Sequence, residues 1–84
     1  MDQSTIKDDI FTRVQKTAAE AFETLAENIS LESSMENVEG WDSLGHLKFI
    51  MTLETEFNIT FSTDQVPTLT NIQLICDIIN QNLS

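Results

Sequence analysis

The chain has few of the residues that form disulfides and metal sites. Cys76 is the single cysteine and His46 the single histidine among 84 residues. One thiol cannot form an internal disulfide or the paired thiolate ligands of a zinc site, and one imidazole adds little. No aspartate-rich loop with a central glycine and a final glutamate is present, which excludes that type of calcium-binding loop. We therefore expect no metal site.

Basic residues and long apolar runs are also scarce. Four Lys and Arg stand against 14 Asp and Glu, so the formal net charge is -10 and the pI is near 4.1. Such a charge repels nucleic acid and anionic membranes and attracts basic protein surfaces. No apolar run approaches the ~18 residues of a membrane span, and the polar, acidic residues 1–9 do not resemble a signal peptide. We therefore expect a cytoplasmic monomer with protein partners, without nucleic-acid binding or membrane insertion.

The length leaves room for one domain. A chain of this size buries only about 60% of its unfolded surface, which allows one core and no cleft between domains. The 40% hydrophobic and 21% charged residues are ordinary for a globular protein. We find no repeat, low-complexity segment or linker, so we predict a single domain over residues 1–84.

Apolar residues recur at helical spacing in three segments, which predicts helices over residues 5–24, over residues 43–57 and from Thr70 onward. Thr5 with Asp8, and Thr70 with Gln73, resemble capping boxes. The predicted apolar faces are Ile6, Ile10, Val14, Ala18, Ala21, Phe22 and Leu25; Leu44, Leu47, Ile50, Leu53 and Phe57; and Ile72, Ile75, Cys76, Ile79 and Leu83.

The connections between these helices differ in length. Residues 26–41 lose the helical period and predict a long loop, anchored by Ile29, Leu31, Met35, Val38 and Trp41. Residues 59–61 alternate like a strand, but three residues without a partner cannot form a sheet. A short helical turn is expected after Ser62, closing before Pro67. The prediction is an all-α, small four-helix bundle with three main helices and a short third helix.

Residues 40–44 lie where the long loop meets the second helix. Gly40 allows a tight turn, and Asp42 or Ser43 is the type of residue that caps a helix. A phosphate ester on Ser43 would be favoured by the free N–H groups and dipole of the helix N-terminus, by roughly 0.3–1 kcal/mol. The alternative is that Ser43 only caps the helix and carries no modification.

The string Gly40-Trp41-Asp42-Ser43-Leu44-Gly45-His46-Leu47, together with chain length, helix order and charge, resembles the acyl and peptidyl carrier protein family. The likeness continues through Met51, Leu53, Glu54, Glu56 and Phe57 to Thr70-Asn71-Ile72. In that family an Asp-Ser-Leu motif opens the second helix, and its serine carries 4′-phosphopantetheine. The resemblance implies that Ser43 is the attachment point, with Asp42 and Leu44 as motif neighbours.

The resemblance also implies a function. The chain would be a free-standing carrier, not itself an enzyme, that holds acyl, aminoacyl or peptidyl thioesters on the arm. A phosphopantetheinyl transferase would supply the arm from coenzyme A. Loading ligases and acyl-processing or transferase enzymes with basic docking patches would use it, and their docking should weaken as salt rises.

The second helix departs from the acidic ladder of fatty-acid carriers. Lys48 and Thr55 stand at positions where that ladder has carboxylates, whereas Glu54 and Glu56 remain. This departure favours a specialised pathway of lipid or secondary-metabolite biosynthesis. We expect His46 and Lys48 on the exposed face, as partner contacts with Glu54 and Glu56 or as solvated surface residues.

Several interpretations remain open in the sequence. The main rival is an unmodified, acidic helical interaction module in which Ser43 is only a cap. A nucleophile–base pair of Ser43 and His46 lacks an orienting acid, an oxyanion hole and a pocket. We expect Cys76 to be a buried, inert thiol and Trp41 to pack the loop on the bundle.

Two further roles are undecided. Leu44 is either the first core contact of its helix or a partner contact, and Gly45 either admits a partner or is tolerated. Side chains that form either core or a cargo cavity are Phe49, Ile50, Leu53, Phe61, Leu69 and Ile75.

Overall fold

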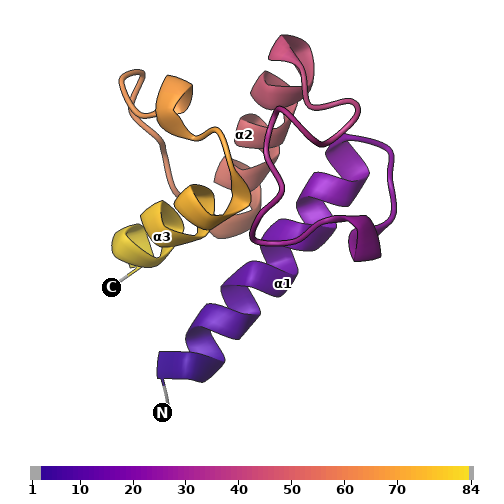
Figure 1. The fold of residues 1–84 in the computed structure, drawn as a ribbon. Coiled ribbons are helices and arrows are strands. Elements are labelled where there is room, and N and C mark those ends of the chain that lie inside the picture. The colour runs from indigo at the N-terminus through magenta and orange to yellow at the C-terminus, as the bar shows by residue number, and fades with distance from the viewer. Residues whose placement is uncertain (1–2, 84) are drawn as a thin grey trace.

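The computed structural model describes the backbone of residues 3–83 and the side chains of residues 9–83. It contains α1 (Gln3–Ala21), α2 (Ser43–Phe57) and α3 (Ile72–Leu83), with single 3-10 turns at η1 (Ala26–Asn28) and η2 (Val66–Thr68) (Figure 1). Within residues 3–83 no strand forms, and the β pairing consists of an isolated bridge between Ser34 and Asn71. The prediction of a small all-α bundle with a long first connection is confirmed.

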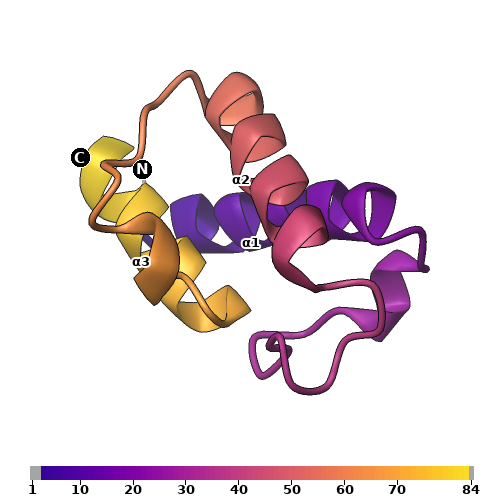
Figure 2. The same cartoon turned by 90° about the horizontal axis from the view of Figure 1, so that it is seen from above.

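Helix α1 is the central element of the bundle. It packs against both α2 and α3, and Figure 2 shows α2 crossing over it. The long loop carries the chain from the end of α1 back to the start of α2. On the way, residues 31–35 hydrogen-bond to the segment that opens α3, including Ile72 N to Ser33 O at 3.0 Å and Met35 N to Thr70 O at 3.2 Å. The loop is therefore fixed to the bundle at the start of α3.

The core combines one face of each helix with side chains from the connections. Its connecting residues include Ile29 and Trp41, which confirms them as loop anchors, whereas Leu31 remains 41% exposed. Among the described side chains, no buried nitrogen or oxygen lacks a hydrogen-bond partner. The buried apolar cluster is Ile10, Val14, Ala18, Phe22, Ile29, Trp41, Phe49, Ile50, Leu53, Phe57, Phe61, Leu69, Ile72, Ile75, Cys76 and Ile79.

Helix α1 differs from its predicted bounds at both ends. It begins at Gln3, so Thr5 lies inside the helix and was wrongly expected at its cap; the side chains of residues 3–8 lie outside the described ones. It ends at Ala21 instead of 24, where Thr24 N bonds to Ala19 O at 2.9 Å and Glu23 adopts a left-handed φ of 56°. Leu25 consequently leaves the helical face and is 61% exposed.

Helix α3 begins two residues after the predicted start. Asn71 caps it, because its Oδ1 accepts the Leu74 N–H at 2.8 Å. The predicted capping box of Thr70 and Gln73 is wrong, since the Gln73 N–H that the box would satisfy donates instead to the backbone oxygen of Leu31 in the loop, at 3.2 Å. At the far end of α3, Leu83 is 47% exposed and does not join the core.

The short third helix is present as a turn of 3-10 helix. The chain turns after Ser62 as predicted, with Gln65 N bonded to Ser62 O at 3.0 Å. The turn does not close before Pro67, however, because Pro67 lies inside η2 at one of its first positions. A proline is tolerated there, since the first N–H groups of a helical turn have no internal acceptor.

Candidate functional site

The start of α2 is capped by Asp42. Its Oδ1 accepts the Gly45 N–H at 2.8 Å, and its backbone oxygen accepts the His46 N–H at 2.7 Å. The residue has extended backbone angles, as an N-cap requires. Of the two cap candidates in the sequence, Asp42 therefore takes the role. The opposite end of α2 closes with Asn58 in the left-handed region (φ 54°, ψ 49°), so the predicted bounds of this helix are confirmed.

Ser43 occupies the first position of α2 and is exposed. Because Asp42 takes the capping bonds, the Ser43 hydroxyl is not needed there, and no described residue hydrogen-bonds to it. The N–H groups of Ser43 and Leu44 precede the first residue whose amide has an intrahelical acceptor. An anionic ester on Ser43 Oγ would lie beside these amides, at the positive end of the helix dipole. The site thus fits an exposed phosphodiester.

Two glycines allow close backbone contacts around the start of α2. Gly40 has a φ of 93°, and a Cβ there would lie 3.0 Å from the backbone oxygen of Phe22 at the end of α1. A Cβ on Gly45 would overlap the backbone oxygen of Gly40. Gly45 therefore admits the chain's own backbone, a role that the sequence analysis missed. The sequence holds one sign of this role, because Gly45 lies in the first turn of a helix, where alanine is normally more favourable than glycine.

His46 is buried, with 8% of its surface exposed. Its Nδ1 lies 3.0 Å from Trp41 Nε1, and its Nε2 lies 2.9 Å from the backbone oxygen of Val66. The indole N–H can only donate, so Nδ1 is the acceptor and Nε2 carries the proton that goes to Val66. The prediction that His46 lies on the exposed face is wrong. Both ring nitrogens are engaged in joining the loop, α2 and η2.

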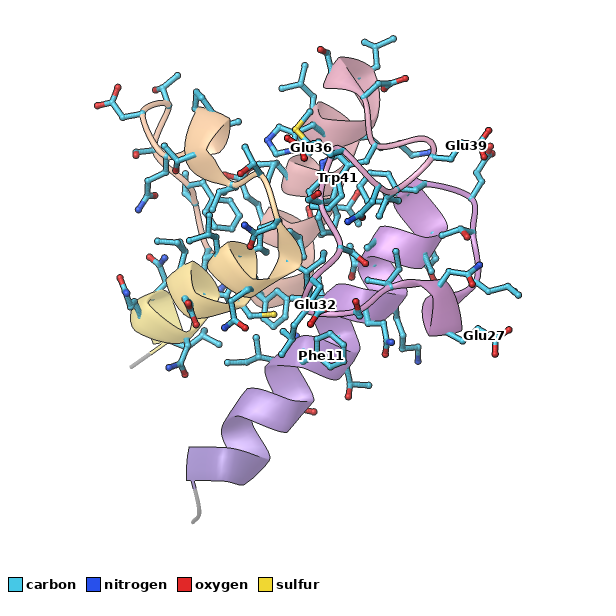
Figure 3. The ribbon with its side chains drawn as sticks, viewed as in Figure 1. Phe11, Glu27, Glu32, Glu36, Glu39 and Trp41 are labelled. Carbon is cyan, nitrogen blue, oxygen red and sulfur yellow. The ribbon has the colours of Figure 1, made fainter. Side chains whose placement is uncertain are left out.

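Trp41, labelled in Figure 3, belongs to an aromatic cluster with Phe22 and Phe49. Its ring stacks on Phe22 at a centroid distance of 5.0 Å and meets Phe49 edge-on at 5.6 Å. Phe22 and Phe49 are themselves 5.1 Å apart. Only 2% of Trp41 is exposed, which confirms that it packs the loop on the bundle.

A family model described as a phosphopantetheine attachment site matches residues 12–79. The chain belongs to this carrier protein family. It is also 30% identical over 74 residues to an acyl carrier protein of Trieres chinensis, covering 88% of this chain and 92% of that relative. The family's prosthetic group is covalently attached 4′-phosphopantetheine, so the cofactor prediction is confirmed. Proteins of this family carry intermediates and are not catalytic in themselves.

The outer face of α2 in this carrier is apolar. Leu44 is 80% exposed, Leu47 53% and Met51 67%. Leu44 is therefore not a core contact, and the predicted buried stripe is wrong for Leu44 and Leu47. Helix α2 instead buries the opposite side, through His46, Phe49, Ile50, Leu53 and Phe57. Lys48 is exposed as predicted, and we call Leu44, Leu47, Lys48 and Met51 the outer face of α2.

The two carboxylates predicted as partner contacts on α2 both have partners inside the carrier. Glu54 Oε2 accepts the N–H of Phe61 at 2.8 Å, which holds the segment after the helix. Glu56 Oε2 lies 3.0 Å from Nε of Arg13, and Arg13 Nη2 donates to the backbone oxygen of Glu56 at 2.8 Å. The guanidinium of Arg13 also lies 4.2 Å from the centre of the Phe57 ring.

Much of the negative charge of this carrier lies on the loop between α1 and α2. Residues 17–47 contain no Lys or Arg. Within this stretch Glu27, Glu32, Glu36 and Glu39 are exposed (Figure 3). On α2 only Glu54 and Glu56 were predicted as acidic partner contacts, and both have partners within the chain, so the loop carries the greater share of free carboxylates among the described residues.

Cys76 of the carrier is a buried thiol, as predicted. Burial, with a smaller contribution from Asp77, raises its pKa to about 12. The residue therefore remains protonated, and thus unreactive, near neutral pH. Among the described residues, no three or more His, Cys, Asp and Glu side chains gather as metal ligands, and no helix is long and apolar enough to cross a membrane.

Proposed function

We propose that Ser43 is the residue that carries the 4′-phosphopantetheine arm. The observation that supports this is an exposed hydroxyl at the start of α2 that has no hydrogen bond to any residue the structure describes, since Asp42 makes the capping bonds. A phosphopantetheinyl transferase would join Ser43 Oγ to the phosphorus of the arm. The phosphoanhydride bond of coenzyme A would break, adenosine 3′,5′-bisphosphate would leave, and the serine proton would pass to the transferase or solvent.

The function is tethering of thioester intermediates. The thiol of the arm holds the acyl, aminoacyl or peptidyl group, and this chain positions the arm for a loading ligase and for acyl-processing or transferase enzymes. Tethering raises the effective concentration of the intermediate, to the millimolar range for a short flexible link. The domain itself would span residues 1–84, supported by a family match over residues 12–79 and a core drawn from all three helices.

Attachment at Ser43 can be tested by intact mass. The wild type is incubated with coenzyme A and a broad-specificity phosphopantetheinyl transferase, beside Ser43→Ala and the control Ser30→Ala, which alters another exposed serine. We expect one arm on the wild type and on Ser30→Ala, and none on Ser43→Ala. A folded wild type that stays bare beside an active transferase control would favour an unmodified interaction module with Ser43 as part of a helix start only.

Docking of the pathway enzymes is proposed on the outer face of α2. This face adjoins Ser43 and exposes three apolar side chains around one positive charge, Lys48. Of the four residues that the sequence predicts as partner contacts, Lys48 remains in the proposed docking face. His46 is buried, and Glu54 and Glu56 are bound within the chain. An apolar face with a lysine suits an enzyme surface that is apolar and offers a carboxylate. This departure from an acidic α2 supports a specialised pathway.

The docking proposal changes the expected salt dependence. Salt screens exposed charge pairs, whereas a contact between apolar side chains has no charge to screen. We expect Met51→Gln to raise the apparent KM of the transferase equally at low and high salt. The control Glu36→Gln, on the acidic loop, should change it little. If the KM for the wild type instead rises steeply with salt and Met51→Gln has no effect, the acidic loop is the docking surface.

A further inference from the structure

The space beneath Ser43 is filled by aromatic side chains. Trp41, Phe22 and Phe49 form a cluster with ring centroids 5.0–5.6 Å apart. Phe49 is 0% exposed, Trp41 2% and Phe22 6%. These rings occupy the part of the core behind the start of α2. An alkyl chain that entered from Ser43 would have to displace them.

The first turns of α2, below Ser43, are also bonded to the neighbouring segment η2. Ser43 and His46 are three residues apart, so they lie one above the other on the helix. The His46 ring links Trp41 at the end of the loop to the backbone of Val66 in η2, through contacts of 3.0 and 2.9 Å. Separating α2 from η2 at this point would break the bond to Val66. The hydrogen-bonded ring thus ties the first turns of α2 to η2, and an alkyl chain passing between them would have to break this bond.

The side chains that the sequence left undecided between core and cargo cavity are packed as core. Phe49, Leu53, Leu69 and Ile75 are 0% exposed. Two surface hollows lie elsewhere. One of about 890 Å³ is lined by residues of the loop around Leu31 and of the start of α3, and one of about 270 Å³ lies between α1 and α3. Neither is lined by Ser43, His46 or any other residue of α2.

We propose that this carrier keeps its cargo outside the helical core, and that the cargo is a short or polar acyl group. The inference rests on the proposed attachment at Ser43. A long alkyl chain on the arm would remain in water, where its apolar surface is unfavourable. A small or polar group, such as an aminoacyl or hydroxyacyl unit, has no such need for burial. The filled core therefore favours a small or polar cargo.

The test loads the arm with acetyl or decanoyl groups from the corresponding coenzyme A thioesters. Methyl NMR spectra then follow Leu53, Leu69 and Ile75, and cleavage by hydroxylamine measures access to the thioester. We expect the two forms to have identical core methyl shifts and equal cleavage rates. Phe49→Val, which opens space beneath Ser43, is the matched control, and there the decanoyl chain should shift the core methyls.

Several outcomes would overturn the inference. Decanoyl-dependent shifts of the wild-type core methyls, slower cleavage of the decanoyl thioester, or shifts of Leu31 in the larger hollow would each show that the fold shelters an alkyl chain. A failure to load Ser43 would instead contradict the proposed function. In that case a decyl chain is attached by alkylating the thiol of Ser43→Cys, and the shifts of the same methyl groups are measured. Cys76 is buried and is therefore not alkylated in the folded protein.

Discussion

Replacement of His46 by phenylalanine tests the hydrogen bonds that join the loop, α2 and η2. Phenylalanine has a similar shape and helix propensity but leaves the Trp41 indole N–H without an acceptor. Trp41 is 2% exposed, so water cannot replace the imidazole. A buried donor left unpaired costs about 1–3 kcal/mol. The carbonyl of Val66 is only half-buried and can bind water, so losing its bond to His46 should add less to the destabilisation.

The expected loss is a large part of the stability of an 84-residue domain, which is roughly 4–13 kcal/mol by size alone. It corresponds to a fall in Tm of roughly 4–8 °C for each kcal/mol lost. Urea unfolding followed by far-UV circular dichroism measures it. Leu47→Phe is the control, since it places the same ring at an exposed position of α2 and should change stability by no more than about 0.5 kcal/mol.

A double-mutant cycle with Trp41→Phe isolates the bond itself. In that background no indole N–H remains to be orphaned, so His46→Phe should cost at least about 1 kcal/mol less than in the wild type. Additive effects of the two substitutions would refute the reasoning. So would a His46→Phe protein as stable as the Leu47→Phe control, because the buried indole would then not depend on the imidazole.

Two further predictions concern Gly45 and Cys76. Gly45→Ala should destabilise the protein by about 1 kcal/mol, because the overlap with the Gly40 backbone outweighs the gain in helix propensity; a more stable variant in thermal unfolding would exclude that close approach. For Cys76, the folded pKa is raised to about 12 from an ordinary 9.0. The contribution of the protonated thiol to the free energy of unfolding is therefore complete below pH 9. It is lost as pH rises toward 12, by up to about 1.4 kcal/mol per pH unit. Unfolding free energies measured between pH 8 and 11 should show this slope in the wild type and a shallower one in Cys76→Ala; equal slopes would contradict it.

The fold class and the limits of α2 could be predicted from the sequence because they depend on local signals. Apolar spacing within one segment predicts a helix there, and Asp42 caps α2 through a bond to Gly45, three residues away. The predicted starts of α1 and α3 failed because several residues near each end can cap a helix. At α3 the choice of Asn71 depends on the loop, which bonds to Thr70 from a distant part of the chain.

The roles of individual residues at the site were less predictable. Leu44 and Leu47 match the helical apolar pattern but face outward, whereas His46, a polar residue, turns inward because Trp41 and Val66 satisfy both of its nitrogens. Likewise, the sequence predicts Glu54 and Glu56 as exposed acidic residues, whereas in the fold Glu54 binds the Phe61 N–H and Glu56 binds Arg13. Each of these outcomes depends on a partner outside the local helix.

By itself the sequence determined the helical class and the Asp-Ser-Leu string at a helix start, because these follow from residue types at short spacing. The family with its phosphopantetheine arm came from the resemblance of that string and its surroundings to known carriers. Only the tertiary structure decided which face of α2 is buried and where the free charges lie. It also decided that rings from Phe22, Trp41 and Phe49 fill the interior behind Ser43. The physical reason is that burial and hydrogen-bond partners are set by segments far apart in the chain, brought together only when it folds.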